Sequence, residues 1–209
     1  MGKEKRYALA DSLRCLGLLE EKTYRLYRDL AERVDLPFVR SLLLHIAYDS
    51  QKHSAVLGGI ADTIAESKIK QKVCQKRFGP TGQMIDDLGR EISETRSLSR
   101  ENIPSLVKKL RALESTAGEE YYTLTQLKTL EYLTKEIRET YDVDLDDVKD
   151  IFESIIRDEE IHGELLSKME KFVVRDEKKN EKAEPVIKYA NPDAWWRTTP
   201  DSVYEDASY

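Results

Sequence analysis

The 209-residue sequence has only two cysteines, Cys15 and Cys74, and neither belongs to a C-x-x-C pair. It therefore encodes no zinc ribbon and no rubredoxin-type iron centre, because both require paired cysteines. Each cysteine falls within an expected helix, where a buried thiol is the more common state. We therefore expect two buried thiols and no disulfide framework.

Long apolar runs are also missing, and none approaches the length needed to span a bilayer. The charged N-terminal residues 1–6 are not followed by an apolar stretch and cleavage site, so we expect no signal peptide. The net charge of −6 and the pI of about 5.3 indicate a mildly acidic surface, whereas nucleic-acid binding requires a clustered basic one. These absences predict a cytoplasmic protein that binds neither membrane nor nucleic acid.

The sequence contains four long helical patterns, and no stretch with the alternation of a strand competes with them. Their apolar residues are spaced by alternating steps of three and four, which is typical of the seam of a helix bundle. We expect the first helix at about Lys5–Val34 and the second from an Asp35 cap to about Arg77. The third opens at Pro104, and the fourth runs from about Leu145 to Val174.

A long connection separates the second and third helices. The run Gly79-Pro80-Thr81-Gly82 breaks the helical pattern, and a shorter helical stretch follows at about Met84–Ser99. These features predict an all-α fold, a four-helix bundle of up-down-down-up order with a long crossover between helices two and three. We assign residues 1–175 to this domain.

The composition changes at about Asp176, where a charged run leads into a segment with prolines, Trp195 and Trp196. We interpret residues 176–209 as an extended C-terminal tail without a core of its own. Because adjacent tryptophans bury a large apolar area, we expect the tail to pack on the bundle or on a partner chain.

The two halves of the helical region repeat one pattern. The stretch from Leu19 to Tyr27 aligns with Leu113–Tyr121, and Asp49–His53 aligns with Asp158–His162. Each half thus has a glutamate on one helix and a histidine four residues after an aspartate on the next. This repetition makes a chance origin for the polar seam residues improbable.

Five of these polar residues occupy seam positions, where an apolar residue would normally lie. Burying such charges without a cation would cost several kcal/mol per ion, which is the physical argument for a metal site. Carboxylate and imidazole ligands suit iron, manganese or zinc. The predicted metal ligands are Glu20, His53, Glu114, Glu159 and His162.

Other residues near the seam have two interpretations. Asp49 and Asp158 are either solvated or accept the free ring N–H of a histidine ligand and fix its tautomer. Tyr27 and Tyr121 are either plain core residues, or they hydrogen-bond a ligand carboxylate or relay an electron. His45 has no matching carboxylate, and we expect it to be a surface or structural histidine.

Ser50 stands where the second half has Glu159, so one expected carboxylate ligand is missing. Three aligned carboxylates would leave two divalent ions with one excess positive charge, which is costly at low dielectric. A bridging anion or a rotated Asp49 could compensate. We expect an asymmetric site, in which Glu114, Glu159 and His162 hold their ion more tightly than the position beside His53 does.

This ligand pattern resembles the ferritin-like superfamily, and within it the rubrerythrin-type proteins. Their pattern has a glutamate on helices one and three and Glu-x-x-His on helices two and four. Glu20, Glu114, Glu159 and His162 match it, and His53 matches the histidine of helix two. The resemblance covers about residues 5–174 and departs at Ser50.

The resemblance implies a ferritin-like bundle with a di-iron centre that reduces dioxygen or peroxide and oxidises ferrous iron. Without rubredoxin-type cysteines, the electrons would come from an external donor. We expect a homo-oligomer, most simply a dimer. Two alternatives remain open: a protein that holds a single or non-iron metal for structure or sequestration, and a degenerate member that acts as a scaffold through its tail.

Overall fold

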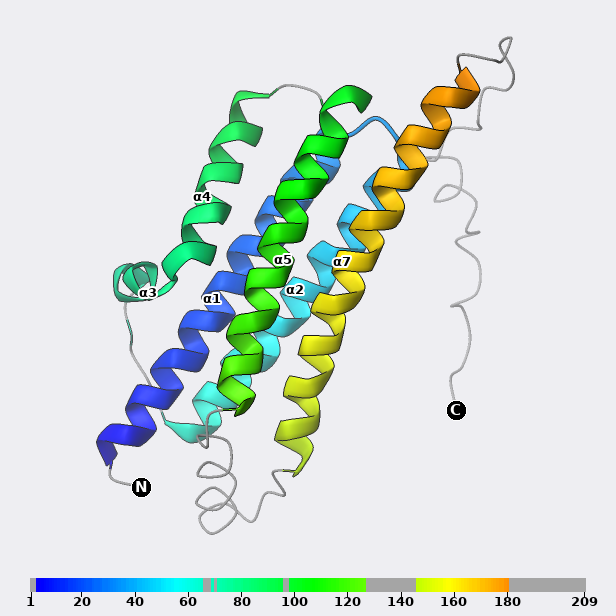
Figure 1. Cartoon of the computed structure of the whole chain (residues 1–209). Coiled ribbons are helices and arrows are strands. Elements are labelled where there is room, and N and C mark those ends of the chain that lie inside the picture. The colour runs from blue at the N-terminus through cyan, green and yellow to red at the C-terminus, as the bar shows by residue number, and fades with distance from the viewer. Residues whose placement is uncertain (1–2, 66–68, 70, 96–97, 127–145, 181–209) are drawn as a thin grey trace, which may run out of the picture. The chain divides into compact units, whose positions relative to one another are not determined.

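The computed structural model describes residues 3–65, 69, 71–95, 98–126 and 146–180. This part of the chain is helical throughout, with six α-helices, one 3-10 turn and no strand (Figure 1). An isolated β-bridge joins Val34 to Leu98. The expected all-α class is therefore confirmed for the described residues.

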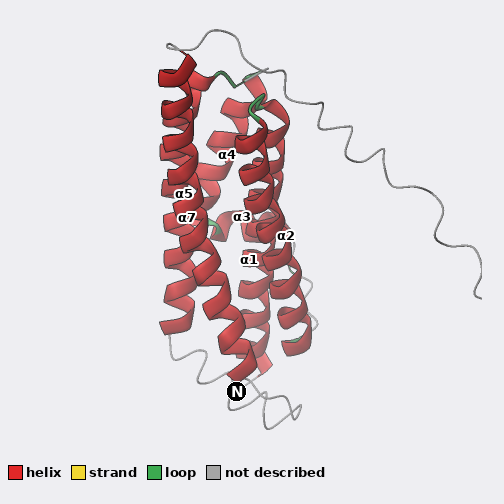
Figure 2. Ribbon diagram, turned by 90° about the vertical axis from the view of Figure 1, so that its right-hand side faces the viewer, coloured by secondary structure: helices red, strands yellow, loops and turns green. Residues whose placement is uncertain are grey.

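Four long helices lie side by side in both views (Figures 1 and 2): α1 (Lys3–Arg33), α2 (Pro37–Ile64), α5 (Ile103–Gln126) and α7 (Asp146–Asn180). Three residues link α1 to α2, so these two helices are antiparallel. The Val34–Leu98 bridge brings the start of α5 to the same end. The rings of Phe38 and Phe172 lie 4.7 Å apart, which places the start of α2 beside the end of α7.

The core consists of two apolar clusters that a polar layer separates along the helices. In α2 the larger cluster ends at Ala47 and the smaller one begins at Leu57. In α7 the smaller cluster ends at Ile155 and the larger one begins at Leu166. The residues between these limits include the predicted ligands of both helices, so the metal-type side chains are enclosed by packed apolar layers.

The connection after α2 differs from the prediction. The second helix ends at Ile64 rather than Arg77, because Ala65 takes an extended conformation with φ −162° and ψ 142°. Two further helices follow, α3 (Gln71–Arg77) and α4 (Gly79–Glu94). Gly79, the first residue of α4, has φ +53°, a left-handed conformation that favours glycine.

Two predicted helix boundaries were also displaced. The Gly79–Gly82 run follows a break in the helical pattern, as expected, since α3 ends at Arg77. It also opens α4, because Pro80 lies in the first turn, where a missing N–H costs nothing. The short helix therefore covers 79–94 instead of 84–99. Leu36, not Asp35, is the N-cap of α2, and no side-chain hydrogen bond caps the helix.

The expectation of two buried thiols was wrong, because Cys15 and Cys74 form a disulfide with their Cα atoms 5.0 Å apart. The bridge joins α1 to α3. A helix continuing straight from Ile64 would have carried Cys74 roughly 15 Å beyond that residue, at 1.5 Å per residue. The break after α2 lets α3 lie against α1 and brings the two sulfur atoms together.

The chain divides into two units, Met1–Val174 and Arg175–Tyr209. The structure describes the second unit only as far as residue 180, so the predictions for the tail, including Trp195 and Trp196, lie outside the described residues. Among the described helices, none combines the length and apolar character required to cross a membrane.

Candidate metal centre

The five predicted ligands meet in the polar layer between the two apolar clusters. Helices α1, α2 and α5 contribute one ligand each, and α7 contributes two from adjacent turns. The steps of three and four along α7 place both ligands on the stripe that also buries Phe152 and Leu166. None of the five side chains is more than 6% exposed: Glu20, His53, Glu114, Glu159 and His162.

The ligand atoms form two groups, each with two carboxylates and one imidazole. We call Glu20, His53 and Glu159 the first triad, and Glu114, Glu159 and His162 the second triad. Within each triad, one ligand atom per residue lies within 4.8 Å of the others. Glu159 belongs to both, so its carboxylate lies between the two positions where an ion would bind.

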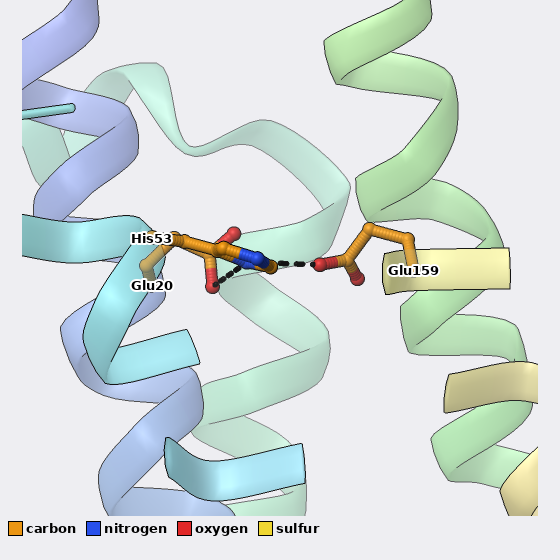
Figure 3. A group of neighbouring side chains, drawn as sticks. All are labelled: Glu20, His53 and Glu159. Carbon is orange, nitrogen blue, oxygen red and sulfur yellow. Dashed lines mark ion pairs between the residues drawn. The ribbon is translucent and has the colours of Figure 1, made fainter. Parts of the chain in front are cut away.

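In the first triad, His53 faces a carboxylate on either side (Figure 3). Its Nδ1 lies 3.3 Å from Glu159 Oε1 and 3.9 Å from Glu20 Oε2. Nevertheless, His53 Nδ1 and Glu159 Oε1 are buried without a hydrogen-bond partner in the part of the chain that the structure describes. Two facing, unsatisfied ligand atoms of this kind are what a bound cation would satisfy.

The second triad is more tightly drawn together. His162 Nδ1 lies 3.1 Å from Glu114 Oε2 and 3.7 Å from Glu159 Oε2. The Tyr27 hydroxyl, which is fully buried, donates a short hydrogen bond to the other oxygen of Glu114. Of the roles considered for Tyr27, the geometry thus favours contact with a ligand carboxylate. Tyr121 lies in α5, but its side chain is outside the described residues.

The two aspartates lie behind the histidine rings, and the pairing is crossed between helices. Asp158 Oδ2 lies 3.0 Å from His53 Nε2, and Asp49 Oδ2 lies 3.3 Å from His162 Nε2. The aspartate of α7 thus contacts the histidine of α2, and the aspartate of α2 contacts the histidine of α7. A carboxylate that accepts the Nε2–H leaves Nδ1 free as the metal-binding nitrogen, and both Nδ1 atoms face the triad carboxylates.

Asp49 therefore does not replace the missing carboxylate, since its oxygen lies on the Nε2 side of His162. Ser50 is buried, at 1% exposure, and α2 contributes His53 to the triads without a carboxylate. His45 is exposed at the surface, with Nε2 3.5 Å from Asp49 Oδ2.

Sequence reasoning missed Lys52, which contacts both aspartates. The available signal was its place three residues after Asp49 and directly before His53.

In the absence of a metal, buried ionisable side chains of the centre bind protons. Burial alone would lower the pKa of His162, but its contacts with Glu114 and Glu159 raise that pKa to about 11. Burial and the nearby charge of Glu159 raise the pKa of Glu114. Burial also opposes ionisation of Glu159, yet its close contacts with His162 and His53 lower its pKa below the ordinary value. Protonated imidazoles thus supply the positive charge that a bound metal would otherwise provide.

A pocket of about 390 Å³ lies between α5 and α7. Its lining joins the buried carboxylates Glu114 and Glu159 to Arg111 on the surface, and it includes one glycine from each helix wall. A side chain added at Gly163 would meet nothing within 4 Å, so packing does not require a glycine there. The pocket thus borders two carboxylates of the second triad.

No family model, curated protein or solved structure matches the chain. The resemblance to ferritin-like proteins therefore depends on the spacing and placement of the ligand residues. The donor set itself fits a divalent metal, because it combines three buried carboxylates with two correctly presented imidazole nitrogens.

Proposed function

We propose that this protein is a ferritin-like metalloprotein whose two triads hold two iron ions in a four-helix bundle with a crossover formed by α3 and α4. The proposed activity is of oxidase or peroxidase type, with electrons from an external donor. The observation that carries the proposal is the sharing of Glu159 between two buried triads of carboxylate and imidazole. Such a bridging carboxylate is typical of di-metal centres in bundles.

Each residue of the centre has a definite role in this proposal. Glu20 and Glu114 each serve one ion, and Glu159 serves both. His53 and His162 present Nδ1 to the ions while their Nε2–H groups donate to Asp158 and Asp49. Bound iron would supply the electron transfer toward dioxygen or a peroxide.

The pocket between α5 and α7 supports a reactive centre rather than a closed structural one. Structural metal sites are enclosed by protein ligands, whereas catalytic sites keep a position open to substrate. The pocket reaches Glu114 and Glu159 and would admit a small oxidant. The Tyr27 hydroxyl orients Glu114 and can exchange a proton with it, since the two groups are hydrogen-bonded.

Ser50 supports the proposal that the two ions are held unequally. Three carboxylates cannot neutralise two divalent ions, so an exogenous anion would have to supply the missing negative charge. The second triad has the shorter His–Glu contact, 3.1 Å against 3.3 Å. We therefore assign the tighter ion to Glu114, Glu159 and His162.

Ser50 also favours one alternative function. If the first triad does not retain its ion, the protein would bind a single metal, iron, manganese or zinc, without di-metal chemistry. In that case the centre would serve metal storage or structure, and the protein would act as a binding or scaffold protein.

Metal analysis combined with an aerobic ferrous-oxidation assay distinguishes these functions. The proposal predicts two ions per chain and oxidation of added Fe²⁺, both lost in Glu159→Gln and retained in Glu164→Gln, because Glu164 is exposed on the same helix and does not line the pocket. One tightly bound ion without oxidation would support the binding protein. Absence of bound metal in the wild type after loading with Fe²⁺, Mn²⁺ or Zn²⁺ would refute both.

A further inference from the structure

Lys52 joins the two aspartates that lie behind the histidine rings. Its Nζ donates to Asp49 Oδ1 at 2.9 Å and to Asp158 Oδ2 at 2.8 Å. Asp49 belongs to the same helix as Lys52, whereas Asp158 belongs to α7. One ammonium group thus connects two helices on the outer side of the proposed metal centre.

The contacts form one continuous chain. In order, the connected side chains are His53, Asp158, Lys52, Asp49 and His162. Each link is a charge-assisted contact, which is stronger and more directional than a neutral one. Because the aspartates are crossed, the orientation of each histidine depends on the helix that carries the other.

The repeat supplies only one such lysine. Ile161 stands at the position of α7 that corresponds to Lys52, and it is 40% exposed. Lys52 is therefore the lysine that both aspartates share. Without it, two carboxylates would face each other across α2 and α7, and like charges at this range repel.

We propose that Lys52 is a positioning residue that fixes Asp49 and Asp158 together, and thereby holds both imidazole rings with Nδ1 directed at the triads. This inference rests on the proposed function, since it assigns Nδ1 of both histidines to metal binding. It also couples the two ion positions through Lys52, whereas among the ligands of the described centre Glu159 alone belongs to both triads.

The competing explanation is an ordinary surface ion pair. Lys52 has a side chain 51% exposed, and exposed pairs contribute little to stability. A surface pair would leave the histidines unaffected when it is removed. The two explanations therefore predict different exchange rates for the Nε2–H protons of His53 and His162 when Lys52 is replaced. They do not differ in the melting temperature that they predict.

The test compares Lys52→Met, which removes the donor, with Lys52→Arg, which keeps it. Lys109→Met is the matched control, because Lys109 is also half-exposed and pairs with one carboxylate, Glu91, at 2.7 Å. The first readout is the exchange rate of the Nε2–H protons of His53 and His162, measured by NMR in the metal-free and the Zn²⁺-loaded protein. The second is Co²⁺ affinity at each position.

We expect Lys52→Met to speed Nε2–H exchange at both histidines by tenfold or more, and to weaken both Co²⁺ positions by about three- to tenfold, somewhat less than for direct partners of metal ligands. Lys52→Arg should restore both properties, and Lys109→Met should change neither. In contrast, Asp49→Asn should act mainly on the His162 position and Asp158→Asn on the His53 position.

Unchanged exchange at both histidines in Lys52→Met would overturn the proposal, and so would an effect confined to one histidine. Failure of the proposed function is a separate result, in which the wild type binds neither Zn²⁺ nor Co²⁺. The exchange rates of the metal-free protein would still decide the role of Lys52 in that case.

Discussion

Replacing Glu159 with glutamine tests whether one carboxylate serves two ions. Glutamine keeps the size of the side chain and removes its charge, so the packing of the polar layer is preserved. Glu159 Oε1 lies 3.3 Å from His53 Nδ1, and Oε2 lies 3.7 Å from His162 Nδ1. Each triad then loses one of its two carboxylates in a single substitution.

The size of the effect follows from this sharing. Two unit charges about 4 Å apart attract by about 4 kcal/mol at an effective dielectric constant near 20, and a divalent ion doubles that figure. Relief of the desolvation cost of the carboxylate offsets much of it. We therefore expect a loss of at least about tenfold in affinity at each position, or about 1.4 kcal/mol per ion.

The assay is an anaerobic Co²⁺ titration followed by visible absorption and calorimetry, with circular dichroism as the check on folding. Glu159→Gln should weaken both positions, whereas Glu20→Gln and Glu114→Gln should each weaken one. Glu160→Gln is the control, because Glu160 is the next residue of the helix and is exposed. If Glu159→Gln weakened only one position, or if Glu160→Gln weakened both equally, the shared-carboxylate model would be wrong.

Four further predictions concern Ser50, the disulfide and the protonation of the centre. Ser50→Glu should raise occupancy of the first triad and increase ferrous oxidation, and metal analysis showing two equal, tight ions in the wild type with no gain would contradict it. Joint replacement of Cys15 and Cys74 by serine should lower the free energy of unfolding by about 4 kcal/mol, from loop closure over a sequence separation of 59, as measured in urea. The raised pKa of His162 stabilises the metal-free protein below pH 6.5, and that contribution is lost as the pH rises toward about 11. Metal-free samples should therefore melt at progressively lower temperatures across this range, and metal loading near pH 7 should release about two protons by calorimetry in different buffers.

The burial and clustering of the five candidate ligands could be predicted from sequence, because each occupies a position where the helical period requires a buried residue. A glutamate such as Glu114, placed between Leu110 and Ala117 on one face, faces the interior whatever the partner helix does. The internal repeat then indicated that the two halves contribute at the same depth. These inferences depend only on helix geometry, which local sequence determines well.

The contacts between helices were harder to predict from the sequence. Which histidine Asp49 approaches depends on the rotation and offset of α2 against α7, and no local pattern encodes those quantities. The crossed pairing and the role of Lys52 therefore became visible only in three dimensions. The break after α2 was missed because Ala65 is neither glycine nor proline, and the disulfide was missed with it, since Cys74 reaches α1 only through that break.

The Cys15–Cys74 bond has a topological consequence for the candidate metal centre. It closes a covalent ring that runs through the C-terminal part of α1, all of α2 and the start of α3. Glu20 and His53 lie inside this ring, whereas Glu114, Glu159 and His162 lie outside it. A protease that cut the short link between α1 and α2 would leave two fragments joined as one species until a reductant was added, so the half of the centre contributed by α1 and α2 would stay covalently connected through a nick in its own backbone.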